Sequence, residues 1–198
     1  MKIGELIMLA TNLQPFLMGI AVSVLVGIAL TLPISSAAIC AAFGLTGLAG
    51  GAAVAGCCAQ MVGFAVMSFK ENRWGGLVSQ GIGTSMLQMG NIIKNPRIWI
   101  APIVTSAITG PMATCLFKLQ MNGTPVSSGM GTCGFVGQIG VYSGWVNNIA
   151  NGTKAAITGF DWAGMILISF VLPAVLCPLI NMLLKKIGWV KDGDMKLS

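Results

Sequence analysis

Two sets of uncharged polar side chains in this sequence have the types and spacing to bind a ligand. Between residues 75 and 96, four of them recur on one face of a helix at 100° per residue, opposite an apolar face. They are Thr84, Gln88, Asn91 and Asn95. Amides and hydroxyls both donate and accept hydrogen bonds, so this stripe suits a neutral ligand rich in hydroxyl groups, such as a sugar. The alternative is a polar stripe that packs against other helices or faces water.

The second set lies between residues 121 and 145, a segment that is rich in Gly, Ser and Thr and has no charged residue. Its candidate binding groups are Ser127, Ser128, Gly129, Gly131, Thr132 and Gln138. The segment is too broken for an ordinary membrane span and too apolar for a plain loop. We therefore expect a re-entrant hairpin over 121–145. The alternative is an extracellular loop with ordinary turns.

The two segments share a local signature. Residues 81–85, Gly-Ile-Gly-Thr-Ser, resemble residues 129–133, Gly-Met-Gly-Thr-Cys, and a Gln follows each. Glycine-rich breaks that recur within one transporter indicate its binding site. Neither copy is a phosphate-binding loop, because no Gly-Lys-Ser/Thr follows.

The remaining residue types exclude most catalytic sites. The chain has no His, and none of its five acidic residues pairs with another inside an apolar run, so a carboxylate-dyad enzyme is not expected. Its six Cys form no CxxC pair, and those in apolar surroundings are interpreted as small buried hydrophobes. We therefore expect no catalytic residues, no cofactor and no metal.

The elements that position these groups are predicted to be membrane helices. Of the 198 residues, 55% are hydrophobic and 8% are charged, and the mean hydropathy is +0.85. A soluble domain carries roughly 25% charged residues, so a water-soluble globular enzyme is excluded. The fold class predicted is all-α, a polytopic membrane protein that forms one domain over residues 1–198.

Hydropathy and glycine breaks divide this domain into six segments. We expect spans over 14–34, 98–117 and 163–184, and a broken span over 36–69 with Gly47, Gly50 and Gly51 in its middle. The segment 75–96 is predicted to be an amphipathic or re-entrant helix. The result is about four net transmembrane crossings, which puts both termini on one side.

The predicted crossings distribute the basic residues unequally between the two sides of the membrane. Nine of them fall on the side of the termini, and only Lys118 and Lys154 fall on the other. Positively charged loops stay in the cytoplasm. We therefore expect a multi-pass protein of the bacterial plasma membrane with both termini cytoplasmic. Charge inside the spans is absent, which argues against an ion-coupled transporter or channel.

Four stretches carry a family resemblance. TLPISSAAI (31–39), GCCAQMVGFAV (56–66), GIGTSMLQMGNIIKNPRIWI (81–100) and GMGTCGFVGQIG (129–140) are similar to IIC-type membrane subunits of the bacterial phosphoenolpyruvate-dependent sugar phosphotransferase system. The nearest subgroup includes toxin regulators of the perfringolysin O regulator type. The resemblance covers about residues 10–185.

The resemblance implies a function and partners. It implies a homodimer that holds a neutral sugar partly in re-entrant hairpins and translocates it to a separate cytoplasmic IIB-type protein, which does the phosphoryl transfer. It also implies that this chain is the C-terminal, substrate-handling half of a longer protein. No nucleic acid partner is expected.

One departure leaves an alternative function. Many sugar-transporting relatives carry a Glu in an Ile-Thr-Glu-Pro loop, where this chain has Ile-Thr-Gly-Pro over 108–111, and they often have a pocket His. Those contacts do not carry over. The alternative is a membrane sensor or regulator of gene expression that has the same fold but does not transport.

Overall fold

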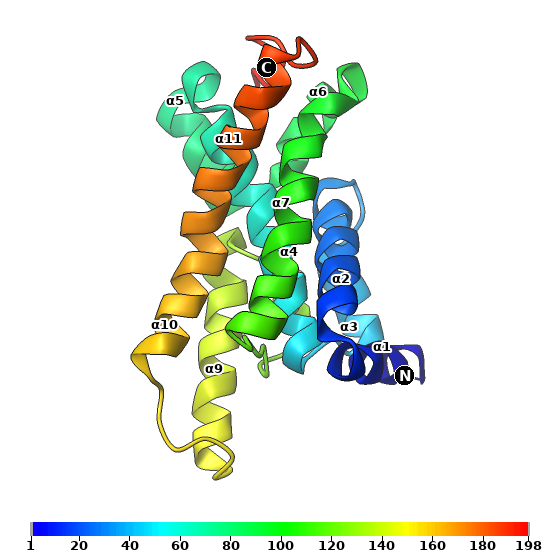
Figure 1. Cartoon of the computed structure of the whole chain (residues 1–198), viewed down its shortest axis with the longest axis vertical. Helices are drawn as coiled ribbons and strands as arrows, with labels where there is room; N and C mark the ends of the chain where they lie inside the picture. The colour runs from blue at the N-terminus through cyan, green and yellow to red at the C-terminus, as the bar shows by residue number, and fades with distance from the viewer. Residues whose placement is uncertain (1, 198) are drawn as a thin grey trace.

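The computed structural model describes residues 2–197, and within that range every regular element is helical. Most of the longer helices run along the longest axis of the molecule, whereas α1 and α5 lie across its two ends, and the N-terminus and the C-terminus are at opposite ends (Figure 1). They are α1 (Lys2–Leu13), α2 (Pro15–Thr31), α4 (Gly47–Met67), α5 (Phe69–Val78), α7 (Ile100–Pro111), α9 (Val136–Ala150) and α11 (Leu172–Lys186). The predicted all-α fold is confirmed.

Shorter helices and turns join them. The short α-helices are α3 (Ser36–Phe43), α6 (Met89–Lys94), α8 (Pro125–Ser128) and α10 (Gly159–Ile166). The π-helical turns are η1 (Ser79–Gly83), η4 (Met112–Leu116) and η6 (Leu167–Val171). The 3₁₀ turns are η2 (Ser85–Gln88), η3 (Pro96–Trp99) and η5 (Cys133–Phe135).

Three continuous helices are long and apolar enough to cross a membrane: Gly47–Met67, Pro96–Leu116 and Gly159–Lys186. The helix α2 is equally apolar but has 17 residues. Figure 1 shows the termini at opposite ends of the long axis, whereas four crossings would put them at the same end. The count of four crossings stays a prediction.

The helix α4 is the centre of the bundle, and its small residues explain why. A Cβ added to Gly56 would lie 1.8 Å from the Ser23 carbonyl oxygen of α2. A Cβ added to Gly51 would lie 1.8 Å from the Leu119 carbonyl oxygen. Small residues allow helix backbones to approach closely where the surrounding lipid is as apolar as Leu. Gly50 and Gly51 therefore serve packing and do not break the helix.

The break in the predicted second span lies just before α4. Gly44 ends α3 in the left-handed conformation (φ 62°), and Gly47 at the start of α4 has φ 59°. Such a conformation is common after a helix C-terminus because glycine has no Cβ. The Ser35 hydroxyl caps the other end of α3 by accepting from the Ala38 N–H. The predicted span over 36–69 is thus two helices, α3 and α4.

The segment 75–96 differs from the continuous helix expected. A π-helical turn over Ser79–Gly83 ends at Thr84, whose backbone is extended (φ −157°, ψ 141°), and a 3₁₀ turn and α6 follow. Five glycines lower the helix propensity of this segment. The Thr84 hydroxyl accepts from the Met86 N–H, which competes with helical hydrogen bonding. The helical period nevertheless identified three amides that face one partner, as described below.

The segment 121–145 forms α8, a turn over 129–135 and most of α9. Three residues of the turn have positive φ: Gly131 (54°), Gly134 (53°) and Phe135 (57°). The helix α9 then runs from the middle of the molecule toward the end opposite the C-terminus (Figure 1). The segment 121–145 thus forms a hairpin, and the tip of the hairpin lies inside the bundle.

Candidate functional site

The tips of the two glycine-rich segments meet against α4. The Thr132 hydroxyl donates to the Gly81 carbonyl oxygen at 2.6 Å and lies 3.6 Å from the Met61 sulfur. Thr132 is fully buried. We call Gly81, Thr132 and Met61 the glycine junction. The shared signature thus marks segments that touch in space.

Two buried polar side chains come from elements that pack against α4, Gln138 from α9 and Ser169 from η6. Gln138 donates through Nε2 to the Cys58 sulfur at 3.3 Å, and its Oε1 has no partner among the described residues. Ser169 in η6 also has a buried hydroxyl without a partner in residues 2–197. Orphaned buried polar atoms are costly, so these are candidate contacts for a polar ligand.

A second polar cluster surrounds Gln60, which the sequence analysis did not single out. The Gln60 Oε1 accepts from the Trp99 Nε1 at 2.8 Å and from the Thr31 hydroxyl at 3.2 Å. Thr31 also shares a 2.9 Å hydrogen bond with Ser85. The Gln60 Nε2 is buried without a partner in the described chain. An amide inside a 21-residue apolar helix was the signal that could have identified it.

The amide stripe of residues 88–95 contacts the C-terminal tail of the chain, residues 189–197. Gln88 donates to the Met195 carbonyl oxygen at 3.0 Å and to the Gln80 Oε1 at 2.9 Å. Asn91 donates to the Lys196 carbonyl oxygen at 3.1 Å. Asn95 donates to the Trp189 carbonyl oxygen at 3.1 Å and to Asp194 at 2.8 Å. These three predicted sugar contacts therefore bind a peptide segment in this structure.

The helix α5 holds the same tail from the other side. The two carboxylate oxygens of Glu71 accept from the Gly193 and Met195 N–H groups, each at 2.9 Å. Asn72 donates to the Met195 carbonyl oxygen at 2.8 Å. Lys185 hydrogen-bonds Asp192 and holds the pKa of that carboxyl below its usual range. The tail is thus fixed mainly through its own backbone groups.

The other predicted site residues have local or packing roles here. The Thr84 hydroxyl caps the following turn, and the hydroxyls of Ser127 and Ser128 bond within their own turn, to Thr124 and to the Pro125 carbonyl oxygen. The Gly129 carbonyl oxygen accepts from the Ser36 hydroxyl at 2.7 Å. A Cβ on Gly131 would lie 2.6 Å from the Cys57 Cβ. Of the second set, only Thr132 and Gln138 lie at the glycine junction or beside it.

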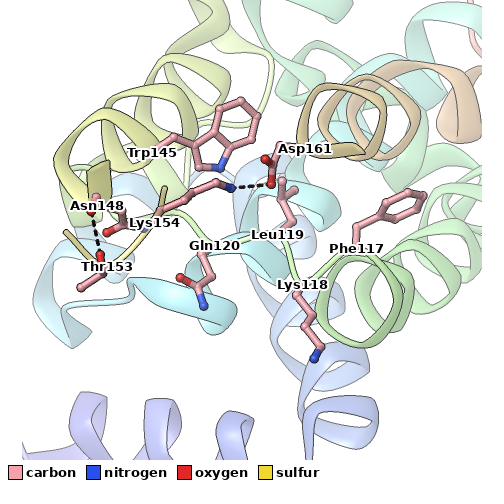
Figure 2. A pocket seen from close by; sticks show the side chains of 9 residues that line it. All are labelled: Phe117, Lys118, Leu119, Gln120, Trp145, Asn148, Thr153, Lys154 and Asp161. Atoms are coloured by element: carbon pink, nitrogen blue, oxygen red, sulfur yellow. Dashed lines mark hydrogen bonds and ion pairs between the residues drawn. The ribbon is translucent and has the colours of Figure 1, made fainter. Parts of the chain in front are cut away.

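A polar cavity of about 280 Å³ lies at the end of the bundle opposite the C-terminus (Figure 2). We call it the Lys154 pocket. It is lined by Phe117, Lys118, Leu119, Gln120, Trp145, Asn148, Thr153, Lys154 and Asp161. The Lys154 Nζ lies 2.6 Å from the Asp161 Oδ1 and 5.5 Å from the centroid of the Trp145 ring. Sequence reasoning missed the pocket because its residues come from three separate segments.

The comparisons with known proteins identify the family. A family model described as "Phosphotransferase system, EIIC" matches residues 1–197. Neither the search of curated proteins nor the search of solved structures gives a match. EIIC domains are the membrane transport component of this sugar-uptake system and are distinct from its phosphoryl-transfer subunits. With the three apolar helices and a match over essentially the whole sequence, this chain belongs to the EIIC family of the phosphotransferase system.

Proposed function

We propose that this chain binds a neutral sugar and translocates it to a separate cytoplasmic IIB-type protein. The observation that carries the proposal is the Thr132–Gly81 hydrogen bond, which joins the tips of two glycine-rich segments at the centre of the bundle. In transporters, broken segments of this kind bind substrate because their backbone groups are free of helical pairing. The family match supports the sugar as substrate and the IIB protein as partner.

The sugar would bind at the glycine junction and its flanking amides. Cys58, Gln60 and Met61 lie within four residues of α4, so their contacts are within about 5 Å along the helix axis. Two sugar hydroxyls inserted between Thr132 and Gly81 would break the hydrogen bond between these residues. One sugar hydroxyl would then hydrogen-bond Thr132 and the other would hydrogen-bond Gly81. The Gln60 Nε2 would donate to the sugar, and the Gln138 Oε1 would accept from it. Binding would therefore satisfy groups that are now orphaned.

We propose that the end formed by α5, α6 and the C-terminus faces the cytoplasm. Eight basic residues belong to this end: Lys70, Arg73, Lys94, Arg97, Lys185, Lys186, Lys191 and Lys196. Cytoplasmic segments are enriched in Lys and Arg. A positive surface would also attract a phosphorylated IIB protein. If α2 and α3 form a hairpin that does not cross, the chain crosses the membrane three times, through its three long helices. The N-terminus would then lie outside the cell. Four crossings would instead put it in the cytoplasm.

Reconstitution tests the transport function. The full-length protein is placed in vesicles with the phosphoryl-transfer subunits inside, and phosphorylated sugar is measured in the lumen for a panel of neutral sugars. Accumulation is expected for at least one sugar and is expected to fall at least about fivefold in Gln138→Ala, because removal of a hydrogen bond to a buried group costs about 1–3 kcal/mol. Gln14→Ala, which removes an exposed amide outside the junction, is the matched control.

A membrane sensor is the second candidate function. The observation that favours it is the C-terminal tail, which occupies the amide stripe through Gln88, Asn91 and Asn95 and so holds that surface in one state. The Gly at position 110, where transporting relatives carry an acid, agrees with it. Saturable sugar binding without accumulation of phosphorylated sugar would exclude transport and support the sensor.

A further inference from the structure

The Lys154 pocket has more hydrogen-bond donors than acceptors. Its one carboxylate is already occupied: the Asp161 Oδ1 pairs with Lys154, and the Oδ2 accepts from the Thr158 N–H at 2.8 Å and hydroxyl at 2.7 Å. The amide oxygens of Gln120 and Asn148 both accept from the Asn122 Nδ2, at 3.1 and 3.3 Å. The carboxylate and amide oxygens of the pocket are therefore used by the protein itself.

The donors of the pocket remain available. The Gln120 Nε2, the Asn148 Nδ2 and the Lys118 Nζ have no partner among the described residues. Figure 2 shows the nitrogen-bearing ends of Lys118 and Gln120 on the same side of the Lys154–Asp161 pair. With two lysines and one aspartate, the lining carries a formal charge of +1 (2 − 1). Donors in excess and a positive charge select a ligand that supplies acceptors and negative charge.

The backbone of the pocket is strained at Lys118. Lys118 has φ 46°, a conformation that costs an L-residue with a Cβ about 1–2 kcal/mol. It lies two residues after the end of the membrane-length helix Pro96–Leu116. Trp145 and Trp162 pack edge to face at 5.5 Å behind the pocket, and aromatic side chains of this kind gather at membrane–water interfaces.

The size of the cavity limits the ligand. Ligand pockets commonly span about 300–1,000 Å³, so about 280 Å³ suits a group no larger than one sugar ring. The Thr153 and Asn148 groups at its rim can hydrogen-bond hydroxyls. A free sugar acid has this chemistry, and so does the phosphoglycerol headgroup of an anionic lipid.

We propose that the Lys154 pocket is a second binding site, distinct from the glycine junction, for a small anionic group that also carries hydroxyls. The ligand binds with its anionic group at Lys118 and the Gln120 amide nitrogen, and with its hydroxyls toward Thr153 and Asn148. The site lies at the end of the bundle opposite the basic surface of α5 and α6. It does not depend on transport of a neutral sugar.

Binding calorimetry on the full chain tests the site. The chain is placed in phosphatidylcholine nanodiscs and titrated with glucuronate and, separately, with glucose. Glucuronate is expected to bind, and any binding of glucose at the glycine junction is expected to be unchanged by Lys118→Gln. Lys118→Gln is expected to weaken glucuronate binding about tenfold or more, since a hydrogen bond to a charged group contributes about 1.5–3 kcal/mol. Lys94→Gln, an exposed charge removed at the other end, is expected to have no effect.

The lipid source is distinguished in a second arm. Nanodiscs that contain phosphatidylglycerol are expected to abolish glucuronate binding if the headgroup occupies the pocket, and Lys118→Gln is then expected to reduce lipid retention during delipidation. Gln120→Ala provides a second variant, and circular dichroism verifies that each variant is folded. Equal effects of Lys118→Gln and Lys94→Gln on glucuronate binding, or no binding in either arm, would overturn the proposal.

Discussion

The two glycine-rich segments have nearly the same signature but use their glycines differently. In the segment 121–145, a Cβ on Gly129 would lie 2.6 Å from the Ser36 carbonyl oxygen, and one on Gly131 would lie 2.6 Å from Cys57. In the segment 75–96, a Cβ on Gly81 would lie at an ordinary 3.4 Å from Ala65, and one on Gly83 would meet nothing within 4 Å. The signature glycines of the first segment are thus closely packed and those of the second are not, and the second segment is held by its amide side chains.

Gly131→Ala is expected to have the largest effect, because Gly131 combines close packing with a positive φ. The added methyl group would overlap the Cys57 Cβ at 2.6 Å and backbone atoms at 2.9 and 3.0 Å. Overpacking costs about 1–3 kcal/mol, and φ 54° adds about 1–2 kcal/mol for a residue with a Cβ. We expect a loss of about 2–5 kcal/mol in the free energy of unfolding, measured by denaturant titration in detergent.

The same experiment with Gly152→Ala separates the two causes. Gly152 also has positive φ (70°) but has no neighbour within 4 Å of an added Cβ. Gly152→Ala should therefore lower the free energy of unfolding only by the cost of a positive φ in a residue with a Cβ, about 1–2 kcal/mol. Equal losses in both variants would mean that close packing at Gly131 contributes nothing.

Gln88→Ala tests the inference that amide side chains hold the segment 75–96 in place. Gln88 is fully buried and donates to the tail and to Gln80, and its Oε1 accepts from Asn91. Each hydrogen bond contributes about 0.5–1.5 kcal/mol net, so a loss of about 2–3 kcal/mol is expected. The tail should also become a faster substrate for carboxypeptidase, followed by mass spectrometry.

A matched control for this variant is Gln14→Ala, which removes an exposed amide between α1 and α2. It is expected to change neither the stability nor the rate of tail digestion. If Gln88→Ala digests at the wild-type rate, the amide stripe does not hold the tail and the contrast between the two segments fails.

The sequence predicted what depends on local pattern. Hydropathy located the three long helices, and the helical period correctly grouped Gln88, Asn91 and Asn95 on one side. It could not reveal that their partner lies about 100 residues away in the tail, because no local property of residues 189–197 marks them as a ligand. The Lys154 pocket was missed for the same reason, since Lys118, Trp145 and Asp161 meet only in the folded chain.

Thr132→Val tests the link between the two segments. Valine keeps the volume of Thr132 but removes the 2.6 Å hydrogen bond, which leaves the Gly81 carbonyl oxygen without that donor. A buried group left unsatisfied costs about 1–3 kcal/mol, and we expect a loss of about 1–2 kcal/mol in the free energy of unfolding. Thr153→Val, which removes an exposed hydroxyl, should cost less than about 0.5 kcal/mol. Equal losses would show that the glycine junction is not held by this bond.

Gly83→Ala is expected to have the smallest effect and therefore gives the sharpest form of the comparison. Gly83 occupies the same place in its signature as Gly131, but its backbone does not have positive φ and no atom lies near an added Cβ. Alanine at such a position restricts the unfolded chain more than the folded one, which stabilises a protein by about 0.4–1 kcal/mol. We expect unchanged or slightly raised stability in the titration used for Gly131→Ala. A loss above about 2 kcal/mol would mean that the two glycines are equivalent and that the shared signature reflects one packing requirement, contrary to the difference described above.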